Sequence, residues 1–100
     1  MMQADIYFDR NDLHGEQSLE TFITGFLMKR KVSGATAFKG AFGFGVNQHL
    51  KQPGLLFSFD EPPMVISFVD EDEKVRKVLT ELRSEYKGGL IVSHQVDIWA

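Results

Sequence analysis

The sequence predicts an α+β fold in which a four-stranded antiparallel sheet carries two helices on one of its faces. The first observation is the order of the apolar patterns, which read strand, helix, strand, strand, helix, strand along the chain. The second is the length of 100 residues, which suits one domain. The third is a hydrophobic content of 43%, which is ample for a packed core. We therefore expect residues 1–100 to form a single domain.

The first half of the chain predicts a strand, a polar loop and a helix. Residues 4–8 alternate apolar and polar side chains, as in a strand with one buried face. Residues 10–15 predict a polar loop. Ser18 is a suitable N-cap for the helix that follows, and Gly34 comes after its basic end. The apolar stripe of this helix consists of Leu19, Phe22, Ile23, Phe26 and Leu27.

The second half predicts a strand, a helix and a final strand. Residues 64–69 form a compact apolar strand. Asp70 and Glu73 have the spacing of a capping box, which predicts a helix with Asp70 as its cap. Gly88 alone explains the end of this helix as an ordinary glycine stop, and the last strand spans residues 90–99. The stripe of the second helix consists of Val75, Val78, Leu79, Leu82 and Tyr86.

Residues 34–45 combine a strand with a glycine-rich hinge. Clustered glycines in a strand usually mark a bend, a bulge or a close backbone approach. The residues that follow, 46–61, predict a long loop, and a long loop on a bent strand is a common place for function in a small domain. The apolar face of the hinge comprises Phe38, Phe42 and Phe44, and the glycines are Gly40, Gly43 and Gly45.

Apolar residues occupy both faces of the predicted strands, although two helices can cover only one face of a sheet. This distribution favours a second subunit on the open face. The alternative is an amphipathic sheet with scattered apolar residues on its surface. In the third strand, Val65 and Val69 lie opposite Met64, Ile66 and Phe68. In the last strand, Ile91 and Trp99 lie opposite Leu90, Val92, Val96 and Ile98.

Charge and composition exclude several classes of protein. A net charge of −3 argues against a nucleic-acid module that is held by backbone electrostatics. Without cysteine, the chain has no disulfide, no thiolate zinc site and no cysteine nucleophile. No signal peptide is visible, and no apolar run approaches the ~18 residues needed to cross a bilayer. We expect a cytoplasmic protein that binds no nucleic acid and does not insert into a membrane.

The titratable residues show no pattern typical of a catalytic or metal site. His14, His49 and His94 lack the spacing of a metal motif. The acidic run 70–73 fits capping at a helix start better than it fits a cation site. We therefore expect no metal ligand and no catalytic residue.

Two glycine-rich segments are candidates for phosphate binding. Gly43-Phe44-Gly45 lacks the full dinucleotide fingerprint, and no helix follows it. Lys87-Gly88-Gly89 joins a helix to a strand, where backbone amides can cradle phosphate oxygens and lysine adds charge. A glycine helix stop is the alternative interpretation of the second segment.

The hinge carries a specific pattern, Gly34-Ala35-Thr36 leading to Gly43-Phe44-Gly45. Other segments that belong with it are Asp12-Leu13-His14-Gly15, Pro63, Ile66-Ser67-Phe68-Val69-Asp70-Glu71 and Gly89-Leu90-Ile91-Val92. Together with the order of elements, these segments resemble the PII-like family known as domain of unknown function 190. The resemblance covers nearly the whole chain.

This resemblance implies a ferredoxin-like fold assembled as a homotrimer, with the sheets packed around the threefold axis. It implies a regulatory protein rather than an enzyme, with a small ligand, often an adenine nucleotide, in clefts between subunits. Ligand contacts are implied at the base of the long loop and at the turn after the second helix. The matching residues here are Lys39, Gly40, Gly43, Gly45, Lys87, Gly88 and Gly89.

The resemblance also implies that the long loop 46–61 regulates a partner protein. Genes for such proteins often lie near those for ion transporters, which makes a membrane transporter a candidate partner. The loop residues expected at this contact are His49, Lys51, Leu55 and Phe57. The turn at residues 87–89 is shorter than in PII proteins, so a smaller or less charged ligand, or none, stays open.

Two other functions stay open at this point. One is a structural or interaction trimer without a small ligand. The other is an acylphosphatase-like hydrolase, whose chemistry needs an arginine in a phosphate-cradling loop after the first strand. Arg10 and Asn11 lie there, but Asp9 and Asp12 would repel an anionic substrate.

Overall fold

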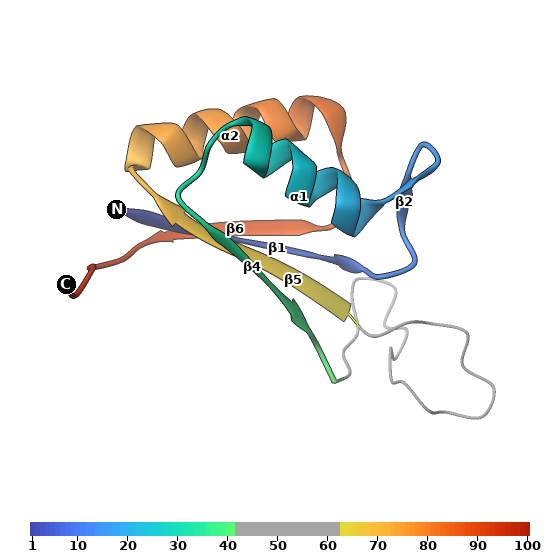
Figure 1. Ribbon diagram of the computed structural model, residues 1–100, viewed down its shortest axis with the longest axis horizontal. Coiled ribbons are helices and arrows are strands. Elements are labelled where there is room, and N and C mark those ends of the chain that lie inside the picture. The colour runs from blue at the N-terminus through green and yellow to red at the C-terminus, as the bar shows by residue number, and fades with distance from the viewer. Residues whose placement is uncertain (42–62) are drawn as a thin grey trace.

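The computed structural model describes residues 1–41 and 63–100 and confirms the predicted fold class. A four-stranded antiparallel sheet lies beneath two helices (Figure 1). The main elements are β1 (Met2–Asp9), α1 (Leu19–Lys29), β4 (Ala35–Lys39), β5 (Pro63–Asp70), α2 (Asp72–Glu85) and β6 (Leu90–Gln95). A small hairpin of β2 (Leu13–His14) and β3 (Gln17–Ser18) lies between β1 and α1.

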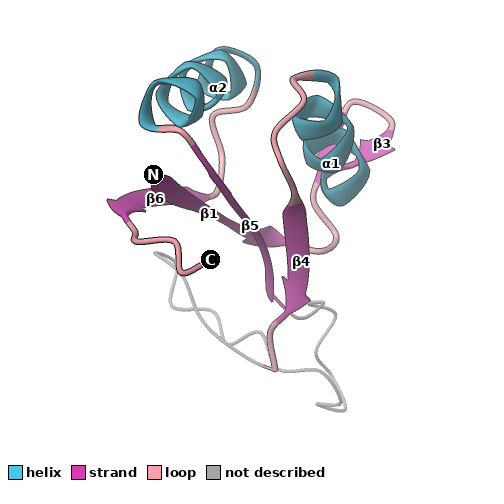
Figure 2. Ribbon diagram, turned by 60° about the vertical axis from the view of Figure 1, so that its left-hand side comes forward, coloured by secondary structure: helices cyan, strands magenta, loops and turns pink. Residues whose placement is uncertain are grey.

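The strand order in the sheet is β4-β5-β1-β6, so the first and third strands of the predicted pattern lie at its centre. Every neighbouring pair is antiparallel. Both helices lie on the same face of this sheet (Figure 2). We call the other face, turned away from α1 and α2, the open face.

Alternate residues of the two central strands form the floor of the core. Ala4 pairs with Phe68 and Ile6 pairs with Ile66, and all four side chains are buried beneath the helices. Because successive side chains of a strand point to opposite faces, this register fixes which residues reach the core. The helices add the stripes predicted from their spacing: Leu19, Ile23, Phe26 and Leu27 from α1, and Val75, Val78 and Leu82 from α2.

The helix α1 starts after the predicted cap, Ser18, and ends at its predicted basic end. The Ser18 side-chain oxygen accepts a hydrogen bond from the backbone N–H of Thr21 at 3.1 Å, which satisfies one of the free amides of the first turn. The helix ends at Lys29, and the left-handed conformation after it belongs to Lys31, with φ of 57°. Gly34 lies after the end of the helix, as the sequence predicts.

The predicted capping box at α2 is wrong. Glu71 is the N-cap residue and makes no side-chain cap bond. Asp70 instead ends β5 with its side chain buried on the helix side of the sheet. Its two oxygens accept hydrogen bonds from the backbone N–H groups of Glu71, at 2.8 Å, and Ser33, at 3.0 Å. Asp70 thus holds the chain before β4 against the end of β5.

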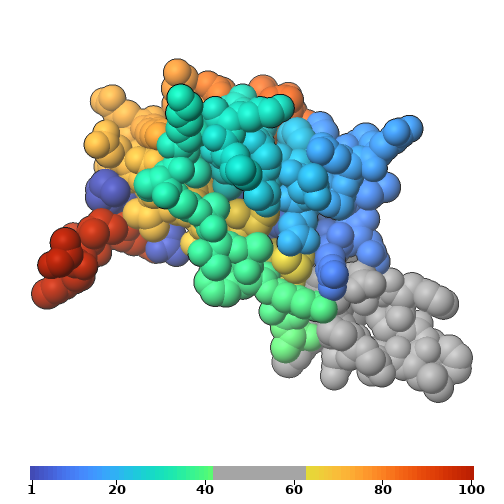
Figure 3. Space-filling model, in the orientation of Figure 1, coloured from blue at the N-terminus to red at the C-terminus, as the bar shows by residue number. Residues whose placement is uncertain are grey.

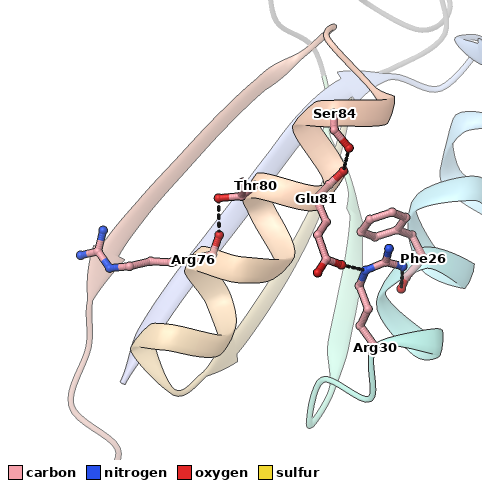
Figure 4. Close-up of polar contacts among 6 residues, drawn as sticks. All are labelled: Phe26, Arg30, Arg76, Thr80, Glu81 and Ser84. Atoms are coloured by element: carbon pink, nitrogen blue, oxygen red, sulfur yellow. Dashed lines mark hydrogen bonds and ion pairs between the residues drawn. The ribbon is translucent and has the colours of Figure 1, made fainter.

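A polar bridge connects the two helices above the core (Figure 4). The Nε of Arg30 donates to a carboxylate oxygen of Glu81 at 2.5 Å, and the guanidinium carbon lies 3.4 Å from the ring centroid of Phe26. Both charged side chains are partly exposed, so an ion pair of this kind contributes about 0–1 kcal/mol. The bridge joins the C-terminal end of α1 to α2.

Two sequence predictions about irregular segments need correction. Residues 10–15 are not only a polar loop, because Gly15, with φ of 64°, allows β2 to turn back onto β3. The ring of His14 stacks on Phe22, with 3.8 Å between the ring centroids. The last strand stops at Gln95 because its partner strand begins at Met2, and residues 96–100 extend away from the body (Figure 3).

Candidate ligand site and subunit interface

The open face of the sheet carries an apolar row that crosses all four strands. The strand register places Phe38, Val65, Tyr7 and Leu90 side by side. Phe38 and Leu90 are 56% and 58% exposed. The next row along the strands is mixed, with Thr36, Ser67, Asp5 and Val92. The prediction of apolar residues on both faces is therefore correct, and they concentrate in one band.

A hollow of about 450 Å³ lies beside this row, along β4 and β5. Its open-face side chains alternate between hydroxyl-bearing and apolar types. No charged side chain lines it among the described residues. Such a surface suits an uncharged group that combines a flat apolar part with hydrogen-bonding atoms. The lining residues are Ser33, Gly34, Ala35, Thr36, Phe38, Ser67, Phe68 and Val69.

The end wall of the hollow is held in place by Asp70 and its neighbours. The Ser33 hydroxyl donates to the backbone carbonyl of Val69 at 2.9 Å, in addition to the N–H of Ser33 that donates to Asp70. Burial raises the pKa of Asp70, but hydrogen bonds from Glu71 and Ser33 and the nearby Lys74 ammonium together hold it below its usual value. The carboxylate is thus ionised, and it fixes one wall of the hollow.

Gly40, one of the predicted ligand contacts, is explained by packing at the end of β4. Its N–H donates to the Pro63 carbonyl at 2.7 Å. A Cβ atom at this position would lie 2.8 Å from the Pro63 ring, which is too close for a side chain. Lys39 precedes it and is exposed. The glycine therefore serves the approach of two chain segments, and Lys39 supplies the charge near it.

The turn at residues 87–89 also owes its glycines to packing. The helix before it ends at Glu85, with Tyr86 in an extended conformation, so Gly88 is not the helix stop. Gly89 takes a φ of 65°, and a Cβ there would lie 2.4 Å from the carbonyl oxygen of Tyr7. A Cβ at Gly88 would lie 2.9 Å from the Tyr86 ring. The turn therefore has a fixed shape around Tyr86.

The structure does not gather the predicted ligand residues into one site within one chain. Lys39 is the last residue of β4 and Gly40 follows it, whereas Lys87, Gly88 and Gly89 precede β6. These strands are three spacings apart in the sheet, roughly 14 Å. The other predicted site residues, Gly43, Gly45, His49, Lys51, Leu55 and Phe57, lie outside the described residues.

Sequence reasoning did not assign the hollow to the ligand site. The available signal was the Gly34-Ala35-Thr36 segment, which carries the family resemblance and forms one side of the hollow. Ser67 and Val69 complete it from β5, and their contribution depends on strand pairing, which the sequence does not state.

The alternative enzyme site after β1 lacks the shape it needs. The N–H of Asp12 donates to the carbonyl of Asp9 at 3.0 Å, which closes residues 9–12 into a tight turn rather than an open phosphate cradle. Over the described ranges, no cluster of histidine and carboxylate side chains could hold a metal ion. In the same ranges, neither helix has the length and apolar content to span a bilayer.

The comparison with protein families settles where the chain belongs. The sequence profile of DUF190, described as "Uncharacterized ACR, COG1993", matches residues 1–98. The chain belongs to the DUF190 family. One UPF0166 protein of Aquifex aeolicus (strain VF5) is 30% identical over 84 residues, which cover 84% of this chain and 86% of that protein. Another from the same strain is 29% identical over 70 residues, 70% of this chain and 66% of that one.

Solved structures show that this DUF190 chain shares its ferredoxin-like fold with PII-like and CutA1 proteins. CPII from Thiomonas intermedia K12, a nitrogen regulatory PII-like protein bound to ADP, AMP and bicarbonate, superposes with a TM-score of 0.71 at 16% identity. That match covers 98% of this chain and 93% of CPII. The divalent ion tolerance protein CutA1 from Ehrlichia chaffeensis matches with a TM-score of 0.65 at 8% identity, over 99% of this chain and 83% of CutA1.

Proposed function

We propose that this DUF190 chain is a cytoplasmic, trimeric PII-like regulatory protein that binds an adenine nucleotide in clefts between subunits. It acts as a regulator rather than as an enzyme. The loop 46–61 contacts a partner protein, for which a membrane transporter is the candidate, through His49, Lys51, Leu55 and Phe57. This last part of the proposal stands on the sequence and the family alone.

The observation that carries the proposal is the open face, which combines an apolar row with a hollow. Large exposed apolar side chains that form a continuous band usually mark an interface. Phe38 and Leu90 lie at the two ends of the band, so a second copy of the sheet would remove the whole row from water. The hollow lies on the same face, and ligand sites usually enclose most of their ligand, which a single chain does not do here.

Two different regions of the chain suit two different parts of an adenine nucleotide. The uncharged hollow beside Thr36 and Ser67 suits a base and its sugar. The phosphate needs amide groups and cations, which Lys39 and the turn around Lys87 offer elsewhere on the sheet. Lys39 follows Phe38 at the end of β4, whereas the turn around Lys87 lies across the sheet from the hollow, so a neighbouring subunit supplies this turn in the proposed trimer. CPII, which has the same fold, is a protein solved with ADP and AMP bound.

The experiment that tests the proposal measures oligomeric mass and nucleotide binding on the same sample. We expect light scattering to give three times the chain mass and calorimetry to give saturable binding of AMP or ADP. Thr36→Phe should fill the hollow and reduce affinity by at least tenfold while the fold is retained, because aromatic side chains suit an edge strand. The same change at exposed Thr24 on α1 is the control. A monomer that binds no nucleotide would contradict the proposal.

A further inference from the structure

Arg83, near the C-terminal end of α2, holds the turn that precedes β6. One of its terminal nitrogens, Nη1, donates to the Gly88 carbonyl at 2.6 Å and to the Tyr86 carbonyl at 3.2 Å. The guanidinium carbon lies 5.8 Å from the centroid of the Tyr86 ring. The arginine therefore draws two carbonyl oxygens of the turn toward one nitrogen while its guanidinium group lies over the Tyr86 ring, and an ammonium group does not reproduce this combination.

Arg83 binds the carbonyl groups of the turn, and the backbone N–H groups of the same turn stay available to bind an anion. Among residues 1–41 and 63–100, no acceptor is found for the N–H groups of Lys87 and Gly88. The Tyr86 ring packs beneath the turn so closely that neither Gly88 nor Gly89 has room for a side chain. Successive free amides in a turn of fixed shape form a small anion-binding surface.

Two carboxylates lie close to this surface. Leu90 pairs with Tyr7, so β1 runs past the turn and ends beside it at Asp9. The hydrogen bond from the Asp12 N–H to the Asp9 carbonyl keeps Asp12 at the same place. Burial first, and then the charges of Asp12 and Asp9, raise the pKa of the Tyr86 phenol, while Arg83 lowers it. Both carboxylates therefore act on the ring under the turn.

We propose that Arg83 is a positioning residue that shapes the 86–89 turn, and that this turn accepts a ligand with one phosphate in preference to a triphosphate. The inference rests on the proposed nucleotide-binding function and names the ligand class. The cations Arg83 and Lys87 are balanced by Asp9 and Asp12, so the turn offers amides without excess positive charge. Each additional phosphate brings negative charge toward the two carboxylates.

The first test compares AMP, ADP and ATP by calorimetry without divalent cations. We expect AMP to bind about tenfold more tightly than ATP, and Asp12→Asn to reduce this ratio about threefold by improving ATP binding. Asp97→Asn, a change in the exposed tail, is the control and should leave the ratio unchanged. ATP binding as tight as AMP binding, or an unchanged ratio in Asp12→Asn, would overturn the inference but leave the proposed function intact. Absence of binding by all three nucleotides would overturn both.

The second test separates positioning from direct contact by substituting Arg83→Lys, which keeps the charge. We expect AMP affinity to fall about tenfold while adenosine affinity and the thermal midpoint stay close to the wild-type values, because only the amide surface changes. Arg76→Lys, on an exposed part of the same helix, is the matched control. An Arg83→Lys protein that binds AMP like the wild type would overturn the positioning role. Equal losses for AMP and adenosine would show a general structural effect and overturn it as well.

Discussion

The same four strands present two faces, one buried under the helices and the other largely exposed. On the helix side, Ile6 and Phe68 are almost fully buried among other apolar side chains of one chain. On the open face, Phe38 and Leu90 belong to an equally continuous apolar row and are more than half exposed. The chain has enough apolar residues for both faces and enough helices for one. The helix side therefore determines the fold of one chain, and the open face is available for association with another chain.

The largest expected effect on stability comes from a cavity on the helix side of the sheet. Ile6→Ala removes a fully buried side chain beneath the helices and should lower the free energy of unfolding by about 3 kcal/mol. Urea denaturation followed by circular dichroism measures this loss. Val92→Ala on the open face is the control and should cost less than about 1 kcal/mol under conditions that keep the chain monomeric. Equal losses at the two positions would remove the distinction between the faces.

A charge in the apolar row tests the open face. Leu90→Asp places a carboxylate where a second sheet would exclude water, so we expect the trimer to dissociate. Light scattering should then give the mass of one chain at concentrations where the wild type is trimeric, with an unchanged far-ultraviolet spectrum. Thr24→Asp on the exposed side of α1 should leave the mass as in the wild type. A stable Leu90→Asp trimer would place the interface elsewhere.

Asp70 lies where the two faces meet at the end of β5, and it gives a pH-dependent prediction. Its pKa is lower in the folded chain than the ordinary value of 3.8, so its stabilisation is present above pH 3.8 and is lost as the pH falls through the lower folded value. Asp70→Asn should cost about 1–2 kcal/mol at pH 7, because two backbone N–H groups lose a charged acceptor.

Urea titrations of Asp70→Asn and wild type at pH 7 and at pH 3 test this linkage. The difference between the two proteins should shrink at the acidic pH, because below pH 3.8 the carboxyl group of the unfolded wild-type chain takes up a proton before that of the folded chain does. A constant difference would show that the carboxylate charge is irrelevant and that only the shape of the side chain matters.

The smallest effect is expected in the helix layer. Arg30→Met removes the ion pair with Glu81 and the contact of the guanidinium group with the Phe26 ring. Because both charged side chains are partly exposed, we expect a loss of about 0.5 kcal/mol that decreases in high salt. Thermal unfolding at low and high ionic strength measures it. A loss that is insensitive to salt would assign the effect to packing instead.

The regular elements could be predicted because each follows from a local pattern. Alternation around Ile6 and Ile66, helical spacing around Ile23 and Val78, and the cap at Ser18 all depend on residues close in sequence. Strand pairing depends on residues that are distant in sequence, so features that arise from it, such as the role of Asp70, were not predicted. Asp70 was interpreted as a cap because its partner Ser33 is 37 positions away.

The candidate site was less predictable for a related reason. The glycines at 40, 88 and 89 suggested approach to a ligand. Gly40 and Gly89 are also required by Pro63 and Tyr7, which only the fold brings near, and Gly88 is required by the ring of Tyr86 close by in the chain. The hollow depends on two strands pairing at a particular register. The Gly34-Ala35-Thr36 motif was the one local signal for this region, and it identified the family before it identified the hollow.

The tail after β6 gives the molecule an internal optical probe. The sequence contains one tryptophan, Trp99, and its side chain is 95% exposed in the single chain. An indole in water emits at long wavelength, and burial shifts the emission to the blue. All tryptophan fluorescence of the protein therefore reports on one position outside the folded body. Its emission maximum at increasing protein concentration would show directly whether neighbouring chains cover the tail as they associate.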